Sequence, residues 1–326
     1  MRTSQSSMRN AECQRSHCRA EAGRSAFTLI EIMVVLVIIA ILAGLLLTAF
    51  GPARQRARET QVVAEMQSLK AAITAFKTDF KMEPPSSIVV SESVAGWATL
   101  PVDRALLKRL WPSFNFGVPR DFNGDGDTTD VIALDGAECL VFFLGGMVDI
   151  GPGTNNTGAL RGFSKNPGNP FAIDNGTRQG PFHEFEGGID PTTKQPLGRL
   201  VDTDGDTFPE YLDSLPSQTQ PIVYFSSYDG TGYRTDNTED ANGNGMLDTG
   251  EDKNGNGRLD HRMQYAYFTD AARKSPYNAS GYQLISPGQD ATYGVGGHLD
   301  PTQFSGNRAG EADNLALFHS GRLGDK

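Results

Sequence analysis

The first strong pattern along the chain is an apolar run from Phe27 to Leu47, FTLIEIMVVLVIIAILAGLLL, in which Glu31 is the only charged residue. A helix of this length rises about 30 Å, which matches the hydrocarbon thickness of a bilayer. Residues 1–26 before it are polar and carry five arginines against two glutamates. This excess of positive charge predicts a cytoplasmic N-terminus, a transmembrane segment over residues 27–50 and an exported remainder.

The next pattern has the spacing of an amphipathic helix. Its apolar residues follow one another at intervals of four or three: Val62, Met66, Leu69, Ile73, Phe76 and Phe80. Pro84 and Pro85 end the pattern, and Gly51-Pro52 interrupts or kinks the chain before it. We therefore predict one long helix over residues 27–81 whose second half packs on a globular domain. A transmembrane helix followed by a separate helix is the alternative.

The remaining segment, residues 82–326, is rich in glycine, asparagine, aspartate and proline, with short apolar runs between them. A short helix is expected over 102–110. Five runs are strand candidates: Leu140–Leu144, Pro221–Ser226, Met263–Phe268, Tyr282–Ile285 and Leu315–Phe318. Short strands between long loops predict an α+β fold, in which an antiparallel sheet lies against the long helix.

The border between the polar and apolar segments, FTLIE, resembles the N-terminus of type IV pilins and type II secretion pseudopilins. In that family a prepilin peptidase cuts before the phenylalanine and methylates the new amine. The resemblance implies cleavage between Ala26 and Phe27, N-methylation of Phe27, and loss of residues 1–26 as a cytoplasmic leader. Ala26 stands where the family usually has glycine, and Glu31 becomes the fifth residue of the mature chain.

A carboxylate inside an apolar membrane segment needs a partner, because no water is present to solvate it. The amine of Phe27 in a neighbouring subunit is a cation at nearly the same depth. Pairing it with Glu31 would set the axial register of each incoming subunit, which agrees with the assembly role that the resemblance implies. A single-span anchor with a tolerated acidic residue is the alternative.

The mature chain would be strongly acidic. Without residues 1–26 it has 24 basic and 37 acidic residues, a net charge of −13. This charge argues against nucleic acid as a partner and is compatible with divalent cations. Cys139 would be the only cysteine left, so we expect no intrachain disulfide and a buried, apolar role for this residue.

The loops carry acidic sequences with the spacing of calcium ligands. DANGNGMLDTGE, residues 240–251, resembles an EF-hand-type loop with glycine sixth and an acid twelfth. The loop after it repeats the scheme, but Met263 takes its closing position. The ligands expected from the two loops are Asp240, Asn242, Asn244, Asp248 and Glu251, then Asp252, Asn254, Asn256 and Asp260.

Two further loops have related patterns. DTDGDTFPEYLD, residues 202–213, resembles the DxDxD calcium repeats of thrombospondin-like modules and offers Asp202, Asp204, Asp206, Glu210 and Asp213. DFNGDGDTTDVI, residues 121–132, offers Asp121, Asn123 and Asp125, followed by Asp127, with Asp130 as a possible substitute for the closing acid. We predict structural Ca²⁺ in these loops, which would hold them where no disulfide can. Solvated turns are the alternative for each loop, because Asp-Gly and Asn-Gly favour turns.

The C-terminal segments YQLISPGQDATYG and GEADNLALF resemble the closing segment of the major, G-type pseudopilin. In that family a loop after the YxLIS strand binds calcium. The resemblance gives Asp290 and Asp313 as the two acidic ligands here, with a simple turn as the alternative.

Sequence signatures of catalysis are absent: the chain has no GxSxG, HExxH, Walker A or GxGxxG pattern. We therefore expect a non-enzymatic subunit of a type II secretion pseudopilus, with its globular domain in the periplasm. Its expected partners are other pilin-like subunits, prepilin peptidase, an inner-membrane platform protein and a secretion ATPase. The main alternative is a type IV pilin that acts as an adhesin or ligand-binding subunit at the cell surface, and a membrane-anchored hydrolase is a third possibility.

Overall fold

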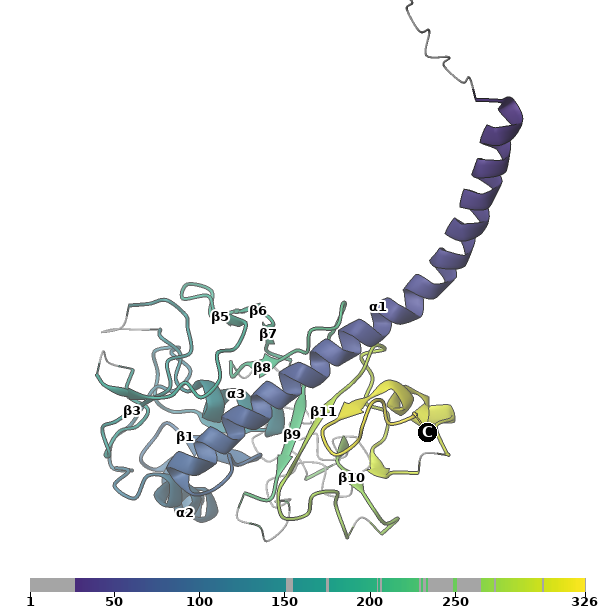
Figure 1. Ribbon diagram of the computed structural model, residues 1–326. Coiled ribbons are helices and arrows are strands. Elements are labelled where there is room, and N and C mark those ends of the chain that lie inside the picture. The colour runs from purple at the N-terminus through teal and green to yellow at the C-terminus, as the bar shows by residue number, and fades with distance from the viewer. Residues whose placement is uncertain are drawn as a thin grey trace, which may run out of the picture. The chain divides into compact units, whose positions relative to one another are not determined.

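The computed structural model divides the chain into two compact units, Met1–Ala53 and Arg54–Lys326 (Figure 1). The described residues are 27–150, 155–173, 176–203, 205, 207–228, 230, 233, 249–250, 265–272, 274–300 and 302–325. Side chains are described at all of these except 46–49. The folded domain lies in the second unit.

Helix α1, Leu29–Phe80, is continuous through Pro52. The expected long N-terminal helix is therefore present. Its residues 54–80 belong to the second unit and lie along the domain (Figure 1). The face predicted from the spacing is the buried one: Val62, Met66, Leu69, Ile73 and Phe76 are each 0–1% exposed. This stripe forms one side of the domain's main hydrophobic core.

The central sheet is small and antiparallel. Its strand order is β13–β11–β9, with bounds Leu315–Ala316, Tyr282–Ser286 and Val223–Ser226. The β9–β11 register runs from Tyr282 opposite Ser226 to Ile285 opposite Val223. One face of this sheet contributes Tyr224 and Leu284 to the main core, and the other contributes Val223, Phe225 and Ile285 to a second apolar cluster. The strand expected at 282–285 is confirmed, as is most of the one at 221–226, which begins at Val223. Of the strands expected at 315–318 and 263–268, residues 315–316 and 267–268 are strands, and residues 263–264 lie outside the described ones.

The other strands form separate pairs instead of extending that sheet. The antiparallel pairs are β1 (Ile88–Ser91) with β2 (Val131–Leu134), β3 (Phe163–Ser164) with β4 (Arg178–Gln179), β5 (Gly187–Ile189) with β6 (Pro196–Gly198), and β7 (Leu200–Val201) with β8 (Glu210–Tyr211). Strand β10, Tyr267–Phe268, pairs in parallel with β12, Gly297–His298. The class is α+β as expected, but the single sheet is replaced by several small ones.

The helices of the domain include one that the sequence pattern misassigned. Helix α2, Pro101–Leu110, is as expected, and short 3₁₀ helices cover Gly96–Thr99 and Gly306–Asp313. The strand expected at 140–144 is wrong, because these residues lie in helix α3, Gly136–Gly145.

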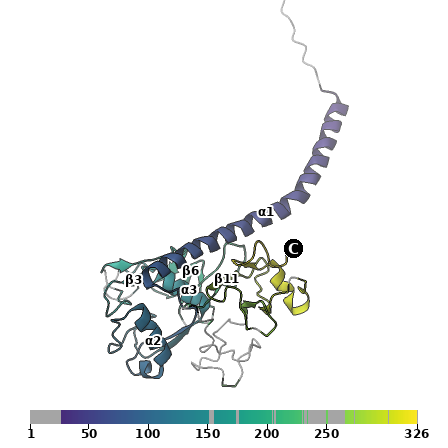
Figure 2. The same cartoon turned by 60° about the horizontal axis from the view of Figure 1, so that its bottom comes forward.

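Helix α3 starts at a capping box, in which the Asp135 side chain accepts the amides of Ala137 and Glu138 while Glu138 accepts the amide of Asp135. All ten of its residues are buried, so its apolar run has no period that distinguishes a helix from a strand. Helices α3 and α1 lie side by side (Figure 2), and the rings of Phe76 and Phe143 meet edge to face at 5.8 Å. Cys139 is buried as expected, and its thiol donates to the Leu134 carbonyl at 3.7 Å.

Candidate assembly and ion-binding sites

The N-terminal end of α1 is closed by a capping box between Thr28 and Glu31. The amide and hydroxyl of Thr28 donate to the Glu31 carboxylate at 2.8 and 2.9 Å, and the Glu31 amide donates to the Thr28 hydroxyl at 3.2 Å. Within one chain, the glutamate therefore satisfies orphan donors at the first turn of the helix. Sequence reasoning missed the role of Thr28, although its Thr-x-x-Glu spacing is the capping-box signature.

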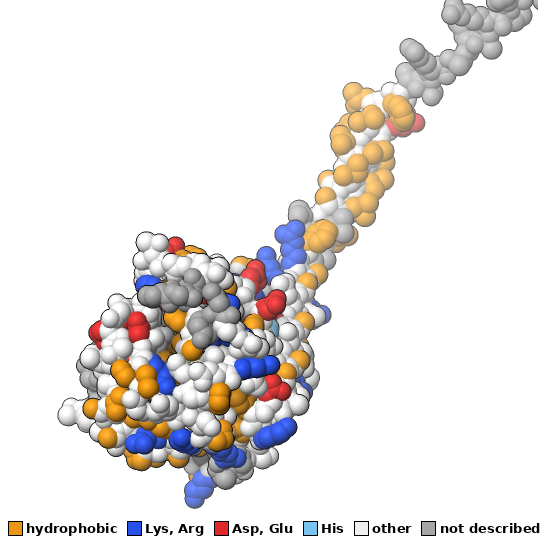
Figure 3. Space-filling model, turned by 90° about the vertical axis from the view of Figure 1, so that its left-hand side faces the viewer, with side chains coloured by type: hydrophobic (Ala, Val, Ile, Leu, Met, Phe, Trp, Pro, Cys, Tyr) orange, Lys and Arg blue, Asp and Glu red, His pale blue; other side chains and the backbone are white. Residues whose placement is uncertain are grey.

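The first unit presents apolar side chains without burying them. From Leu29 to Leu45 the large apolar residues are about half exposed or more, and Phe27 is 79% exposed. Figure 3 shows apolar side chains dominating this part of α1. Among the described residues, α1 is the helix that is long and apolar enough to cross a membrane. Ala26 lies outside the described residues, so the geometry of the predicted cleavage site is not described.

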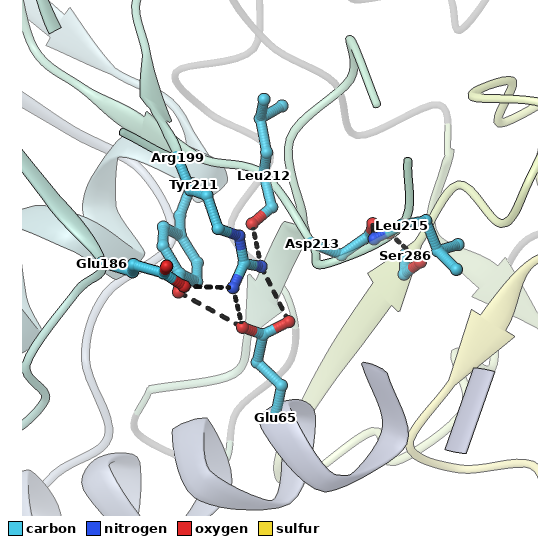
Figure 4. A network of polar contacts seen from close by, with 8 residues as sticks. All are labelled: Glu65, Glu186, Arg199, Tyr211, Leu212, Asp213, Leu215 and Ser286. Atoms are coloured by element: carbon cyan, nitrogen blue, oxygen red, sulfur yellow. Dashed lines mark hydrogen bonds and ion pairs between the residues drawn. The ribbon is translucent and has the colours of Figure 1, made fainter. Parts of the chain in front are cut away.

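Inside the second unit, a polar network holds α1 to loops of the domain (Figure 4). Arg199 donates to both carboxylate oxygens of Glu65 and to the carbonyl of Leu212. The guanidinium also lies 4.5 Å from the centre of the Tyr211 ring, and the Tyr211 hydroxyl donates to Glu65 at 3.2 Å. Burial opposes the charge on Arg199, but the contact with Glu65 outweighs burial and raises the pKa of the guanidinium.

The loop at 121–130 gathers acidic side chains, although not the set that the sequence predicted. Carboxylate oxygens of Glu92, Asp125, Asp127 and Asp130 all lie within 4.8 Å of one another. Asp121 is turned into the loop, where its two oxygens accept the amides of Gly124 and Gly126.

Asn123 acts within this loop through both ends of its amide. Its oxygen accepts the amide of Asp125 at 3.0 Å, and its nitrogen donates to Asp125 and Asp130 at 3.3 and 3.1 Å. Of the residues that the sequence offered here, Asp125, Asp127 and Asp130 lie in the cluster, whereas Asp121 and Asn123 make hydrogen bonds within the loop. Glu92 lies about thirty residues upstream, and no local pattern could have identified it.

Asp202 and Glu210, two of the ligands predicted at 202–213, each accept hydrogen bonds from different backbone amides. Asp202 accepts the amides of Gly205 and Thr207, and the buried Glu210 accepts the amide of Thr203. Asp204 and Asp206 lie outside the described residues, as do all the ligands predicted at 240–251 and 252–260. Metal binding by these loops stays a prediction.

Asp213 is directed toward strand β11 (Figure 4). Its carboxylate accepts the Ser286 hydroxyl, the Gln218 side-chain amide and the Leu215 backbone amide. Burial raises the pKa of this carboxyl, and these donors partly oppose the shift. Metal binding by Asp213 stays a prediction.

Asp290 and Asp313 come together despite their separation in sequence. The Asp313 carboxylate accepts the amides of Gln289 and Asp290 at 2.6 and 3.1 Å. Burial and the neighbouring Asp313 both raise the pKa of Asp290. Gly288 permits this approach: its φ is +70°, and a Cβ there would lie 2.4 Å from the Asp313 carbonyl oxygen. The carboxylate of Asp313 thus closes a turn, and calcium binding by the pair stays a prediction.

Comparison with known proteins identifies a family signature at the N-terminal end. Residues 22–47 match the prokaryotic N-terminal methylation motif. No curated protein and no solved structure matches the chain. The motif supports the type IV pilin and pseudopilin family, and it indicates a pilin-like protein that prepilin peptidase processes and that assembles into filaments. With the apolar part of α1, it also suggests that the protein is anchored in a membrane.

Proposed function

We propose that this chain is a structural subunit of a type II secretion pseudopilus. Prepilin peptidase would cut it between Ala26 and Phe27 and methylate the new amine. The observation that carries this proposal is the FTLIE sequence within the methylation motif, followed by an apolar helix with exposed side chains. In this arrangement the domain starting at residue 82 is periplasmic, and the chain is extracted from the inner membrane into a filament that supports protein export.

Glu31 supplies the register contact in this proposal. In the isolated chain its carboxylate is held by the amide and hydroxyl of Thr28. The neutral donors of Thr28 leave the negative charge uncompensated, and an unpaired charge is costly in lipid. The methylated amine of Phe27 in a neighbouring subunit would compensate it and so favour one axial position of the incoming helix.

The domain would serve as the outward-facing part of the filament. The buried stripe of α1 and the Glu65–Arg199 contact fix residues 54–80 to the rest of the second unit. We propose no catalytic role for this domain. The energy for assembly would come from the platform protein and the secretion ATPase.

We also propose that structural Ca²⁺ holds the acidic loops of the domain. The support is geometric: acids from distant parts of the sequence meet at 121–130 with Glu92, and Asp290 meets Asp313. Carboxylate oxygens are the ligands that Ca²⁺ prefers.

A secretion assay separates this function from that of a surface pilin. Deleting the gene should leave type II cargo in the periplasm, and the wild-type chain should restore export. If export is unaffected and the chain is found on extracellular fibres, the pseudopilus proposal is wrong and the adhesin alternative is favoured.

Variants at the N-terminal end test the assembly contact. We expect Glu31→Gln to be inserted and cleaved but not to enter filaments, because it retains the side-chain shape without the charge. The matched control is Thr28→Ala, which removes the capping hydroxyl and keeps the carboxylate, so it should still assemble. Wild-type incorporation of Glu31→Gln into cross-linked filaments would contradict the role of Glu31.

A further inference from the structure

The acidic cluster at 121–130 is built on the end of the β1–β2 pair. Ser91, the last residue of β1, is paired with Val131, the first residue of β2. The backbone continues this pairing by one step, because the Glu92 amide donates to the Asp130 carbonyl at 2.9 Å. The Glu92 carbonyl also accepts the amide of Arg120 at 2.9 Å. The backbone of Glu92 is therefore hydrogen-bonded to both ends of the 121–130 loop.

The side chain of Glu92 is fully buried and only partly satisfied. It is 0% exposed, and one carboxylate oxygen accepts the Phe122 amide at 2.6 Å. The other oxygen is buried and has no hydrogen-bond partner among the described residues. A buried carboxylate oxygen without a partner is costly, whereas a cation can satisfy it.

No protein cation neutralises the cluster within the described part of the chain. Arg120 donates to the side chain of Asn169 and to the carbonyls of Asn115, Val118 and Gly168 instead. The Lys194 ammonium lies beside Gly124, but it forms no ion pair with these acids in the described residues. The cluster thus holds more negative charge than its surroundings compensate.

We propose that Glu92, Asp125, Asp127 and Asp130 form a calcium site that joins the 121–130 loop to the end of strand β1. Two ligands on opposite sides of Ca²⁺ lie about 4.6–5.2 Å apart, because each Ca–O bond is about 2.3–2.6 Å. The corresponding span for Mg²⁺ is about 4.0–4.2 Å. The four carboxylate oxygens all lie within 4.8 Å of one another, which is compatible with their binding one Ca²⁺ together.

The site differs from the loop motif that the sequence suggested. Its buried ligand comes from β1, and the other three are the exposed or half-exposed acids of the loop. Water oxygens would complete the coordination of the Ca²⁺, which usually has six to eight ligands. Binding would therefore stabilise the closed loop against opening. This inference rests on the structural Ca²⁺ proposed above for the acidic loops, for which it names the ligands of one site, and it does not depend on a role in secretion.

Hydrogen–deuterium exchange of the full chain in detergent, after chelation and with or without added Ca²⁺, tests the site locally. Peptides covering 121–130 report on this loop separately from the loops at 240–260. If the loop must release calcium to open, calcium at 100 times its dissociation constant slows exchange about 100-fold. We expect this protection in the wild type and its loss in Glu92→Gln and in Asp127→Asn.

The two variants and one control make the result unambiguous. Asp127 is exposed, so Asp127→Asn should fold even if Glu92→Gln does not. Glu251→Gln removes the closing acid of a different predicted loop and should keep the protection at 121–130. Absence of protection in the wild type, or protection that persists in both Glu92→Gln and Asp127→Asn, would overturn the site. Equal protection by Mg²⁺ would overturn its assignment to calcium.

Discussion

The contact between Glu65 and Arg199 gives the sharpest stability prediction for the domain. The side chains of Glu65 and Arg199 are 14% and 18% exposed, so truncating Glu65 leaves a guanidinium charge largely out of water. Breaking a buried ion pair by removing one partner costs about 3–5 kcal/mol. Because both groups retain some access to solvent, we expect Glu65→Ala to lower the free energy of unfolding by about 3 kcal/mol, the lower end of that range.

The same geometry predicts that the second substitution will cost much less than the first. Once Glu65 is gone, Arg199→Met removes the uncompensated charge and keeps apolar contact with the Tyr211 ring. In a double-mutant cycle we therefore expect a coupling energy of about 2 kcal/mol. Glu186→Ala is the matched control. That carboxylate contacts the same guanidinium at 3.4 Å but is 76% exposed, so its loss should cost under about 0.5 kcal/mol.

The assay is denaturant unfolding of the full chain in detergent, followed by tryptophan fluorescence. Both tryptophans of the chain, Trp97 and Trp111, lie in the domain core, so the signal reports on this domain. A stability of Glu65→Ala within about 0.5 kcal/mol of the wild type would contradict the cost of the unpaired guanidinium. Additivity of the two substitutions would contradict the coupling between Glu65 and Arg199.

Two further predictions concern burial and close packing. Burial lowers the pKa of His183 below 6.5, while the nearby charges of Glu65 and Glu184 raise it and that of Arg199 lowers it. The folded state therefore binds the proton less tightly than the unfolded state, so stability is complete above about pH 6.5 and falls as the pH drops below it. Unfolding of the wild type and of His183→Gln at a series of pH values isolates this effect: the stability of the wild type relative to the variant should fall as the pH drops below about 6.5, and a relative stability that does not change with pH would contradict it. At Gly136 a Cβ would lie 1.8 Å from the Tyr224 carbonyl oxygen, so Gly136→Ala should cost about 3 kcal/mol. Gly51→Ala, where a Cβ meets nothing within 4 Å, is the control, and equal unfolding of both variants would contradict the packing argument.

Sequence alone could predict the features that depend on local periodicity. The stripe from Val62 to Phe76 is buried as its spacing indicated. A helix that packs on a core with one face has apolar residues on that face, and they recur at intervals of three or four along the sequence. The same reasoning fails for 140–144. There the helix is buried on every side, and the deciding signal was the Asp135 cap, which lies outside the apolar run.

The candidate sites show the same division between local and distant contacts. The capping box of Thr28 and Glu31 was readable from a spacing of three residues. By contrast, Glu92 reaches the 121–130 loop only because β1 pairs with β2, and Asp290 reaches Asp313 only through the fold of the C-terminal segment. Such pairings depend on tertiary topology, which a single sequence does not display.

Processing of this chain by prepilin peptidase is tested most directly by mass spectrometry of the N-terminus of the protein from membranes. We expect a mature chain that begins at Phe27 and carries a methyl group on its amine. A chain that retains residues 1–26, or that is cut at another position so that Glu31 is not the fifth residue, would contradict it.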